Sequence, residues 1–305
     1  MSFTVTILGS NAALPALGRH PSAHFLEMLH EYILIDCGEG TQMQMTRYGC
    51  SALRIQRIFI THLHGDHYLG LMGLLFSMHL QRRRQELHLY APHGLDEIIT
   101  LQLRHSNSAL SFPLHFHAVP TDTKALIYQS PRISVFTLPL QHKIPCAGYL
   151  FQENPKPVRI NKDKLPDSFP IRHIAQLKQG LDITDESGSI LWKNTDLTLP
   201  PKPSRSYAYC SDTRFTPALA DLIQGVDLLY HEATFAEADA DKATETRHST
   251  AKQAAQMAQL CGARQLLIGH FSARNKNPDE LLEEARRVFP DTLLATEGES
   301  IVIPD

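Results

Sequence analysis

The chemistry that this sequence suggests is concentrated in one short segment, Thr61–His67, which reads THLHGDH. It holds four potential metal ligands directly after an apolar run: His62, His64, Asp66 and His67. The chain has 17 histidines in 305 residues, and a random chain of this composition would contain the pattern only roughly 0.003 times. Imidazole and carboxylate groups are good ligands for Zn²⁺ and similar divalent cations. The segment therefore predicts a metal site in a loop that follows a short buried strand.

The spacing within the segment favours two cations over one. Side chains alternate along an extended chain, so His62 and His64 can point the same way and hold one ion. Asp66 and His67 are adjacent and diverge from that pair, which suits a second ion a few ångström away. Two cations about 3.5–4 Å apart can stabilise both the attacking and the leaving oxygen of a phosphoryl displacement. The segment therefore indicates a hydrolase that acts on phosphate esters.

A pair of cations needs more ligands than this segment supplies, and three further candidates follow other predicted strands. They are His142, Asp212 and His270. In α/β proteins, functional side chains gather where strands give way to loops, so these positions can meet at one edge. Asp212 is the best candidate for a bridging ligand because a carboxylate has two oxygens. Taken singly, each of the three could instead be a structural histidine or an aspartate in a turn.

The hydrophobic pattern predicts strands and helices that alternate along the chain. The expected strands are residues 3–8, 25–36 (two short strands with a break at His30-Glu31), 58–61, 86–91, 133–140, 207–209, 227–231, 265–268 and 300–303. The expected helices are residues 39–48, 69–81, 94–103, 250–260 and 280–288. This order and the length of 305 residues predict a single α/β domain over residues 1–305.

Composition narrows the classes of protein to which the chain can belong. Hydrophobic residues make up 43% and charged residues 20%, as in ordinary globular proteins. The sequence has no apolar run of membrane-spanning length, and its start, MSFTVTILGS, lacks the pattern of a secretory signal, so no membrane partner is expected. Five scattered cysteines without a CxxC motif make disulfides unexpected and fit a reducing cytoplasm. The net charge is −3, so nucleic-acid binding would need a local basic patch.

A basic segment between the predicted strands at 133–140 and 207–209 could supply that patch. Residues 153–204 have prolines near both ends and are predicted to form an inserted arm outside the core. Within it, residues 155–178 carry six basic side chains against two acidic ones, Asp163 and Asp167. The arm is either a solvated mobile loop or an RNA-binding exosite whose cations contact phosphates. The candidate substrate-binding residues of the arm are Lys156, Arg159, Arg172 and Lys178.

A series of motifs resembles the ribonuclease Z family, the tRNA 3′-processing endonucleases of the metallo-β-lactamase superfamily. The motifs follow that family's order over nearly the whole chain: LGSNAALP, DCGEGTQ, THLHGDH, HKIPCAGY, YCSDT, HEATF, HST and GHFSAR. The resemblance implies a four-layer αββα sandwich, the metallo-β-lactamase-like fold, with a protruding arm that grips the tRNA elbow. The family's arm often has a Gly-Pro pair before Leu-Lys-x-Gly; here Leu177–Gly180 matches and the Gly-Pro pair is absent.

The resemblance also implies a set of ligands for two zinc ions per subunit, although Mn²⁺ or Fe²⁺ fits similar ligands. It gives His62, His64 and His142 to the first ion, Asp66, His67 and His270 to the second, and Asp212 to both. Asp66 would accept a proton from the attacking water, and His248, supported by Glu232, would donate one to the leaving 3′-oxygen. Arg274 would hold a phosphate. From the residues alone, His248 could be a solvent-facing residue before the helix at 250–260, and Arg274 a surface arginine.

The implied reaction is removal of the 3′ trailer from precursor tRNA, which leaves a tRNA 3′-hydroxyl and a 5′-phosphorylated trailer. By the same resemblance, the protein would be a homodimer in which the arm of one subunit serves the active site of the other. Two alternatives stay open. A small-molecule phosphodiesterase would share the metal ligands without needing the arm, and a catalytically silent RNA-binding protein would not need all seven ligands.

Overall fold

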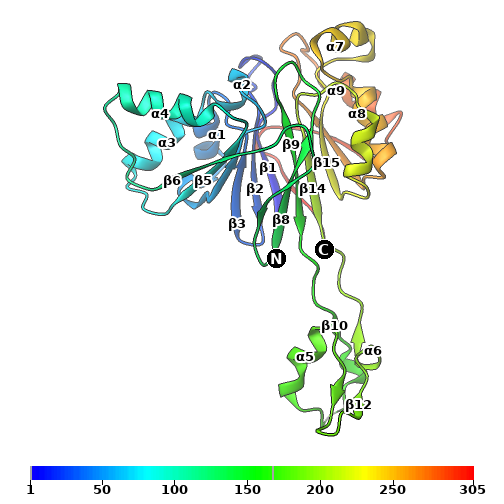
Figure 1. Ribbon diagram of the computed structural model, residues 1–305. Coiled ribbons are helices and arrows are strands. Elements are labelled where there is room, and N and C mark those ends of the chain that lie inside the picture. The colour runs from blue at the N-terminus through cyan, green and yellow to red at the C-terminus, as the bar shows by residue number, and fades with distance from the viewer. Residues whose placement is uncertain (1, 167) are drawn as a thin grey trace.

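The fold consists of two facing seven-stranded sheets whose outer surfaces are covered by helices (Figure 1). The computed structural model describes residues 2–166 and 168–305, so Asp167 of the basic segment lies outside the described residues. The four layers run helix, sheet, sheet, helix. The predicted αββα sandwich is therefore confirmed. In the described part of the chain, no helix is long and apolar enough to cross a membrane.

The first sheet has the strand order β18-β1-β2-β3-β4-β5-β6. Its strands are β1 (Phe3–Gly9), β2 (Ala23–Met28), β3 (Glu31–Ile35), β4 (Arg57–Phe59), β5 (Leu87–Ala91), β6 (Leu114–Ala118) and β18 (Ser300–Val302). Strands β3 to β6 are parallel, so their carboxyl ends reach the same edge. The helices α1 (Thr41–Arg47), α3 (Leu71–Leu80) and α4 (Leu95–His105) pack on its outer face through one apolar cluster. Strand β18 pairs with β1, and Thr6 Oγ1 lies 2.7 Å from Ser300 Oγ.

The second sheet has the order β17-β16-β15-β14-β9-β8-β7. Its strands are β7 (Leu126–Gln129), β8 (Ile133–Pro139), β9 (Ala147–Glu153), β14 (Ser206–Cys210), β15 (Leu228–Glu232), β16 (Gln265–Gly269) and β17 (Thr292–Leu294). Strands β14 to β17 are parallel, so their carboxyl ends also share one edge. The helices α8 (Ala251–Cys261) and α9 (Asp279–Arg286) cover its outer face. Helix α8 begins with a capping box between Thr250 and Gln253.

Alternation along the strands explains how the layers are joined. In β14, Tyr207 and Tyr209 point between the sheets, whereas Ala208 and Cys210 point towards α8. The layer between the sheets is rich in aromatic side chains, and the rings of Tyr209 and Tyr230 stack at 4.6 Å between centroids. The Tyr209 hydroxyl donates to Asp36 Oδ2 of the first sheet at 3.0 Å. This contact joins the two sheets close to the edge where their parallel strands end.

The basic segment leaves the second sheet between β9 and β14 and projects away from the sandwich (Figure 1). It holds β10 (Arg159–Ile160), α5 (Ile174–Lys178), β11 (Ile183–Thr184), β12 (Ile190–Trp192), α6 (Asn194–Leu197) and β13 (Thr198–Leu199). A small apolar cluster of its own orders it: Phe169, Leu177, Ile183 and Leu197. At its base, Lys156 and Lys202 both form ion pairs with Asp305. The arm is thus a compact module held by two connecting segments without regular secondary structure.

Candidate functional site

The structure brings all seven predicted metal ligands together at one edge of the sandwich. Five elements or the loops after them supply these residues. His62 and His64 follow β4, Asp66 and His67 lie in the short helix α2 (Gly65–Tyr68), His142 lies between β8 and β9, Asp212 follows β14, and His270 follows β16. Both sheets therefore contribute, because the carboxyl ends of their parallel strands meet here.

Three histidines and one oxygen of Asp212 form the first cluster. Nδ1 of His64 lies 3.0 Å from Nε2 of His62 and 3.1 Å from Nε2 of His142. Oδ2 of Asp212 lies 3.6 Å from Nε2 of His62 and 3.7 Å from Nε2 of His142. For a tetrahedral zinc ion with bonds of 2.0–2.1 Å, neighbouring ligand atoms are about 3.3 Å apart. The observed spacings fit that geometry.

The second cluster is built around the other oxygen of Asp212. Oδ1 of Asp212 lies 3.2 Å from Nε2 of His67 and 3.1 Å from Nε2 of His270. Oδ2 of Asp66 lies 3.4 Å and 3.5 Å from the same two nitrogens. Both of these Nε2 atoms are buried and make no hydrogen bond to any described residue. Buried polar atoms normally have a partner. A cation bound in this cluster would be the partner that these two nitrogens lack.

Hydrogen bonds behind the clusters fix which nitrogen of each imidazole faces inwards. Nδ1 of His67 donates to the Asp36 carboxylate at 2.8 Å, and Nδ1 of His142 donates to the carbonyl of Arg247 at 3.2 Å. Nδ1 of His270 lies 2.9 Å from Thr234 Oγ1. In a neutral imidazole whose Nδ1 carries the proton, Nε2 has a free lone pair. Each of these three imidazoles, when neutral, therefore presents the lone pair of Nε2 to the interior of a cluster.

The electrostatics of the clusters favour added positive charge. Burial alone would lower the pKa of His67, but the carboxylates of Asp212, Asp66 and Asp36 outweigh it and raise that pKa well above its usual value. Burial alone would raise the pKa of Asp212, but His270, His67 and His62 hold it well below its usual value. The carboxylate of Asp212 thus stays ionised in a largely buried space. Divalent cations bound by these ligands would replace the proton that the carboxylates otherwise hold on His67.

A buried carboxylate and an imidazole form an ion pair beside the second cluster. Nδ1 of His248 lies 2.8 Å from Oε1 of Glu232, and Glu232 also accepts from the backbone nitrogens of Thr213 and Ser249. Burial disfavours the imidazolium, but the charge of Glu232 and its hydrogen bond outweigh burial and raise the pKa of His248 to about 9. Nδ1 faces Glu232, so Nε2 is the nitrogen that can donate a proton to a ligand. The side chain is therefore suited to act as a general acid.

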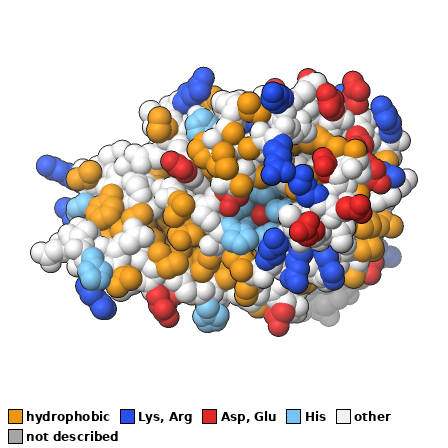
Figure 2. Space-filling view, turned by 90° about the horizontal axis from the view of Figure 1, so that it is seen from above, with side chains coloured by type: hydrophobic (Ala, Val, Ile, Leu, Met, Phe, Trp, Pro, Cys, Tyr) orange, Lys and Arg blue, Asp and Glu red, His pale blue; other side chains and the backbone are white. Residues whose placement is uncertain are grey.

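A cavity of about 700 Å³ opens over the clusters. Asp66, Asp212, His64, His142, His248 and His270 line it. Figure 2 shows it as a hollow with histidine and acidic side chains inside and with Lys and Arg side chains on both sides. Arg274, Lys242 and Lys143 are among the residues that line it. The backbone nitrogen of Ala13 donates to Oδ2 of Asp66 at 2.7 Å, whereas Oδ1 of Asp66 makes no hydrogen bond to a described residue.

Comparison with known proteins identifies the family. The family model described as "Anti-Pycsar protein Apyc1" matches residues 3–154. Ribonuclease Z of Cytophaga hutchinsonii is 47% identical over 305 residues, which is 100% of this chain and 97% of that protein. The chain belongs to the ribonuclease Z family. The metallo-β-lactamase fold protein YhfI of Bacillus subtilis, at 19% identity and a TM-score of 0.70 over 99% of this chain and 100% of that one, shares the fold.

A solved member of the ribonuclease Z family gives the same result in three dimensions. The short form of human tRNase Z is 30% identical, with a TM-score of 0.73 that covers 99% of this chain and 100% of that chain. The two proteins therefore share the fold over nearly the whole of both chains. The matched 99% of this chain includes residues on both sides of the basic arm.

The candidate substrate-binding residues of the arm differ in their surroundings. Lys156 is already paired with Glu153 at 2.7 Å and with Asp305 at 3.1 Å. Nε of Arg159 donates to the carbonyl of Pro200 within the arm at 2.8 Å. Arg172 and Lys178 are exposed. The arm lies at the opposite end of β14 from Asp212, so none of these residues is close to the metal ligands of its own chain (Figure 1).

Sequence reasoning missed Asp36, which lies directly behind His67. Asp36 follows β3 and adopts a left-handed backbone with φ of 55°. Its carboxylate accepts from both the backbone and the hydroxyl of Thr61 and from the hydroxyl of Tyr209. A signal was present, because Asp36 ends a predicted strand within DCGEGTQ. Asp36 contacts the clusters only through His67, so the spacing of the metal ligands in the sequence does not point to it.

Asp36→Asn is expected to weaken binding of divalent cations by about 10–100-fold, because the amide cannot accept the proton of His67 Nδ1 as the carboxylate does. The measurement is a competition titration against a chromogenic chelator, with circular dichroism to establish that the variant is folded. Asp96→Asn, in the exposed first turn of α4, is the matched control and should bind as the wild type does. Wild-type affinity in folded Asp36→Asn would contradict the orienting role.

Proposed function

We propose that this chain is a metal-dependent endoribonuclease that removes the 3′ trailer from precursor tRNA. The proposed products are a tRNA 3′-hydroxyl and a 5′-phosphorylated trailer. The observation that carries the proposal is the position of Asp212, whose two oxygens face two separate ligand clusters beside the ion pair of His248 and Glu232. Family membership at 47% identity over the whole chain supports tRNA as the substrate.

The proposed ligands follow from the two clusters. His62, His64, His142 and Asp212 would hold one ion, and Asp66, His67, His270 and Asp212 would hold the other. Two zinc ions per subunit suit this set of imidazoles and carboxylates, and Mn²⁺ or Fe²⁺ would fit the same atoms. When bound, such ions supply hydroxide near neutral pH and offset the negative charge of the phosphoryl transition state.

The protein side chains would carry out the proton transfers. Oδ1 of Asp66 is the acceptor in reach of the cavity, since Oδ2 is held by the backbone nitrogen of Ala13. Burial raises the pKa of Asp66, but the charge of His67 and the nearby imidazoles of His270 and His67 outweigh burial and lower it, so the carboxylate is ionised at neutral pH. His248, held by Glu232, would protonate the leaving 3′-oxygen, and Arg274 would contact a phosphate from the cavity wall.

The proposal includes a homodimer in which each arm serves the partner's site. The arm of one subunit starts at the edge of the second sheet opposite its own ligands, because Arg205 and Asp212 lie at opposite ends of β14. Helices α1 and α3 and the residue after α2 expose apolar side chains that a second copy would cover: Met43 is 72%, Leu69 59% and Leu80 76% exposed. Figure 2 shows hydrophobic side chains on that side of the hollow.

A cytoplasmic location is proposed on the same basis. All five cysteines are free thiols, and four of them are buried. Burial raises the pKa of the Cys37 thiol to about 12 and that of the Cys50 thiol to about 11, so both stay protonated and unreactive at neutral pH. A chain with unpaired thiols is suited to a reducing compartment.

Incubation of the purified protein with a precursor tRNA should give a single cut after the tRNA body and a 5′-phosphorylated trailer. A strong chelator should abolish the cut, and added Zn²⁺ or Mn²⁺ should restore it.

Asp66→Ala should lose turnover and keep tRNA binding in a filter assay, because Asp66 is both a ligand and the proposed proton acceptor. Persistent scission in chelator would refute the metal mechanism, and unchanged cleavage by Asp66→Ala would refute the proposed acceptor.

His248→Ala should slow cleavage of precursor tRNA by about 10²–10⁴-fold, the usual contribution of a general acid. Diesters with an activated leaving group, such as bis(p-nitrophenyl) phosphate, need little protonation of the departing oxygen and should lose much less. The comparison is made from kcat for both substrates with wild type and variant. Lys252→Ala, on the exposed part of α8, is the control. An equal loss on both substrates would argue against the acid role.

Replacement of residues 155–203 by a short linker should raise KM for precursor tRNA at least about tenfold, because phosphate contacts are lost, while bis(p-nitrophenyl) phosphate is still cleaved. Mixing this arm-deleted chain with Asp66→Ala should restore part of the activity in mixed dimers, since each chain supplies what the other lacks. The measurements are steady-state kinetics and sedimentation. Undiminished cleavage of precursor tRNA by the arm-deleted protein would favour a small-molecule phosphodiesterase.

A further inference from the structure

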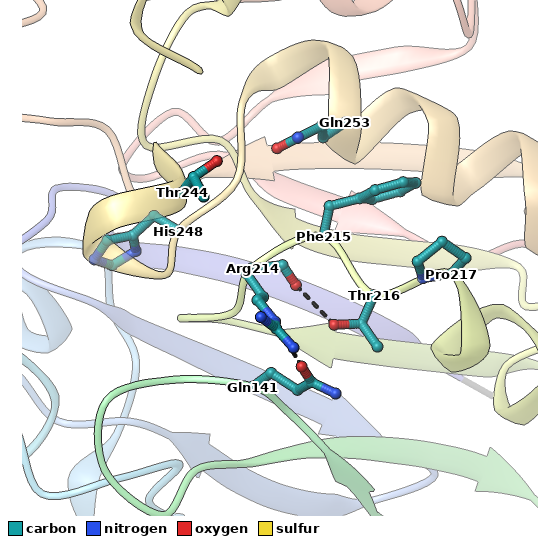
Figure 3. A pocket seen from close by; sticks show the side chains of 8 residues that line it. All are labelled: Gln141, Arg214, Phe215, Thr216, Pro217, Thr244, His248 and Gln253. Carbon is teal, nitrogen blue, oxygen red and sulfur yellow. Dashed lines mark hydrogen bonds between the residues drawn. The ribbon is translucent and has the colours of Figure 1, made fainter. Parts of the chain in front are cut away.

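A second cavity lies on the other side of His248 from the ligand clusters, and Figure 3 shows the side chains around it. Its volume is about 320 Å³, which is in the range of small-ligand sites. His248 lines both this cavity and the one over the clusters. Arg214 and Phe215 line it from the loop after β14, and Gln253 lines it from the first turn of α8.

The polar side of this cavity offers hydrogen-bond donors. Nε of Arg214 donates to Oε1 of Gln141 at 2.6 Å, and this bond fixes the plane of the guanidinium (Figure 3). The two terminal nitrogens of Arg214 make no hydrogen bond or ion pair to any residue that the structure describes. Oε1 of Gln253 accepts from the backbone nitrogen of Thr250 at 3.0 Å, so its amide nitrogen remains available. Such a set suits an anionic, acceptor-rich ligand.

The apolar side of the cavity is formed by Phe215. The ring packs in part against the core beneath the second sheet, and its remaining surface lines the cavity. A partly exposed aromatic ring next to an unpaired arginine is the combination that binds a nucleotide, because the base stacks on the ring while the cation contacts a phosphate. Neither group belongs to the metal clusters or to the ion pair of His248 and Glu232.

The position of His248 determines which nucleotide this cavity would take. In the displacement, the bond between the water oxygen and phosphorus forms, the bond between phosphorus and the 3′-oxygen breaks, and the proton of His248 Nε2 goes to that oxygen. The phosphorus must lie on the side of the clusters, so the nucleoside that carries the departing oxygen lies on the other side of His248. We propose that this cavity is a leaving-nucleoside pocket, which binds the ribose and base immediately 5′ of the cleaved bond, with the base against Phe215.

A neighbouring surface continues the pocket along the loop between β8 and β9, which carries His142. A third cavity shares Gln141 and Arg214 with the leaving-nucleoside pocket and adds Lys143 and Arg247. Its three cations can contact successive phosphates upstream of the bound nucleoside. The tRNA body therefore approaches past Arg214, and the trailer leaves past Arg274 and Lys242 on the opposite wall. This assignment rests on the proposed function and adds the direction of the RNA chain to it.

The test combines Phe215→Leu, which keeps most of the packing volume, with three precursor tRNAs under single-turnover conditions. One substrate is intact, one has a ribose without a base immediately 5′ of the cut, and one has it immediately 3′ of the cut. Phe215→Leu should lower kcat/KM on the intact substrate about tenfold through lost stacking. The same loss should appear with the 3′-abasic substrate and should vanish with the 5′-abasic one. Phe215→Tyr should behave as the wild type, and Phe116→Leu, on the edge strand β6, is the control.

Any result that differs from this pattern overturns the assignment of the cavity as a leaving-nucleoside pocket. An equal loss on all three substrates, no loss on the intact one, or a loss that vanishes only with the 3′-abasic substrate would show that Phe215 does not bind the leaving nucleoside. Equal melting temperatures of Phe215→Leu and wild type exclude a folding defect as the cause of a loss. If the wild type cuts none of the three, the proposed function fails and the pocket with it; cleavage with the wrong pattern overturns the pocket alone.

Discussion

The carboxylate of Asp212 is the contact on which the site depends. It is almost completely buried, and each of its oxygens faces imidazole nitrogens of a different cluster. A buried anion is stable only with compensating positive charge, so the residues around it must deliver that charge from several directions. The chain does this by ending parallel strands of two sheets at one edge. The position of one side chain thus ties the topology of the sandwich to its chemistry.

The edge is held in place by contacts that cross between the sheets. The backbone nitrogen of Ala147 donates to the carbonyl of Thr61, and the Tyr149 hydroxyl donates to the carbonyl of Ile60. Asp36 then connects Thr61, His67 and Tyr209. These buried bonds fix the loop after β4 relative to the second sheet. A loop positioned so firmly can present imidazoles at ligand spacing before any cation binds, which reduces the ordering cost of binding.

Much of this arrangement could be predicted from the sequence, because periodic strands and a dense histidine motif are local signals. The strands around Phe3–Leu8, Ile133–Leu140 and Gln265–Ile268 were predicted within about a residue or two, which is within the usual uncertainty of element boundaries. Four strands of the two sheets were not predicted: β6, β7, β9 and β17. The residues of β6 are largely exposed and resemble a polar loop, β9 begins inside the HKIPCAGY motif, and β17 has only three residues. The contacts of Asp36, and the cavity beside Arg214 and Phe215, depend on residues that are far apart along the chain, so no local pattern reveals them.

The pairing of β18 with β1 has a consequence for the synthesis of this protein. Thr6 and Ser300 are 294 positions apart, and β1 has its partner on that side only once β18 is made. Until then, a nascent chain on the ribosome carries an open strand edge of buried, apolar character, Phe3 to Gly9. Such an edge can pair with another chain. Because β18 is the last strand to be made, it cannot protect this edge of β1 from other chains while translation is under way.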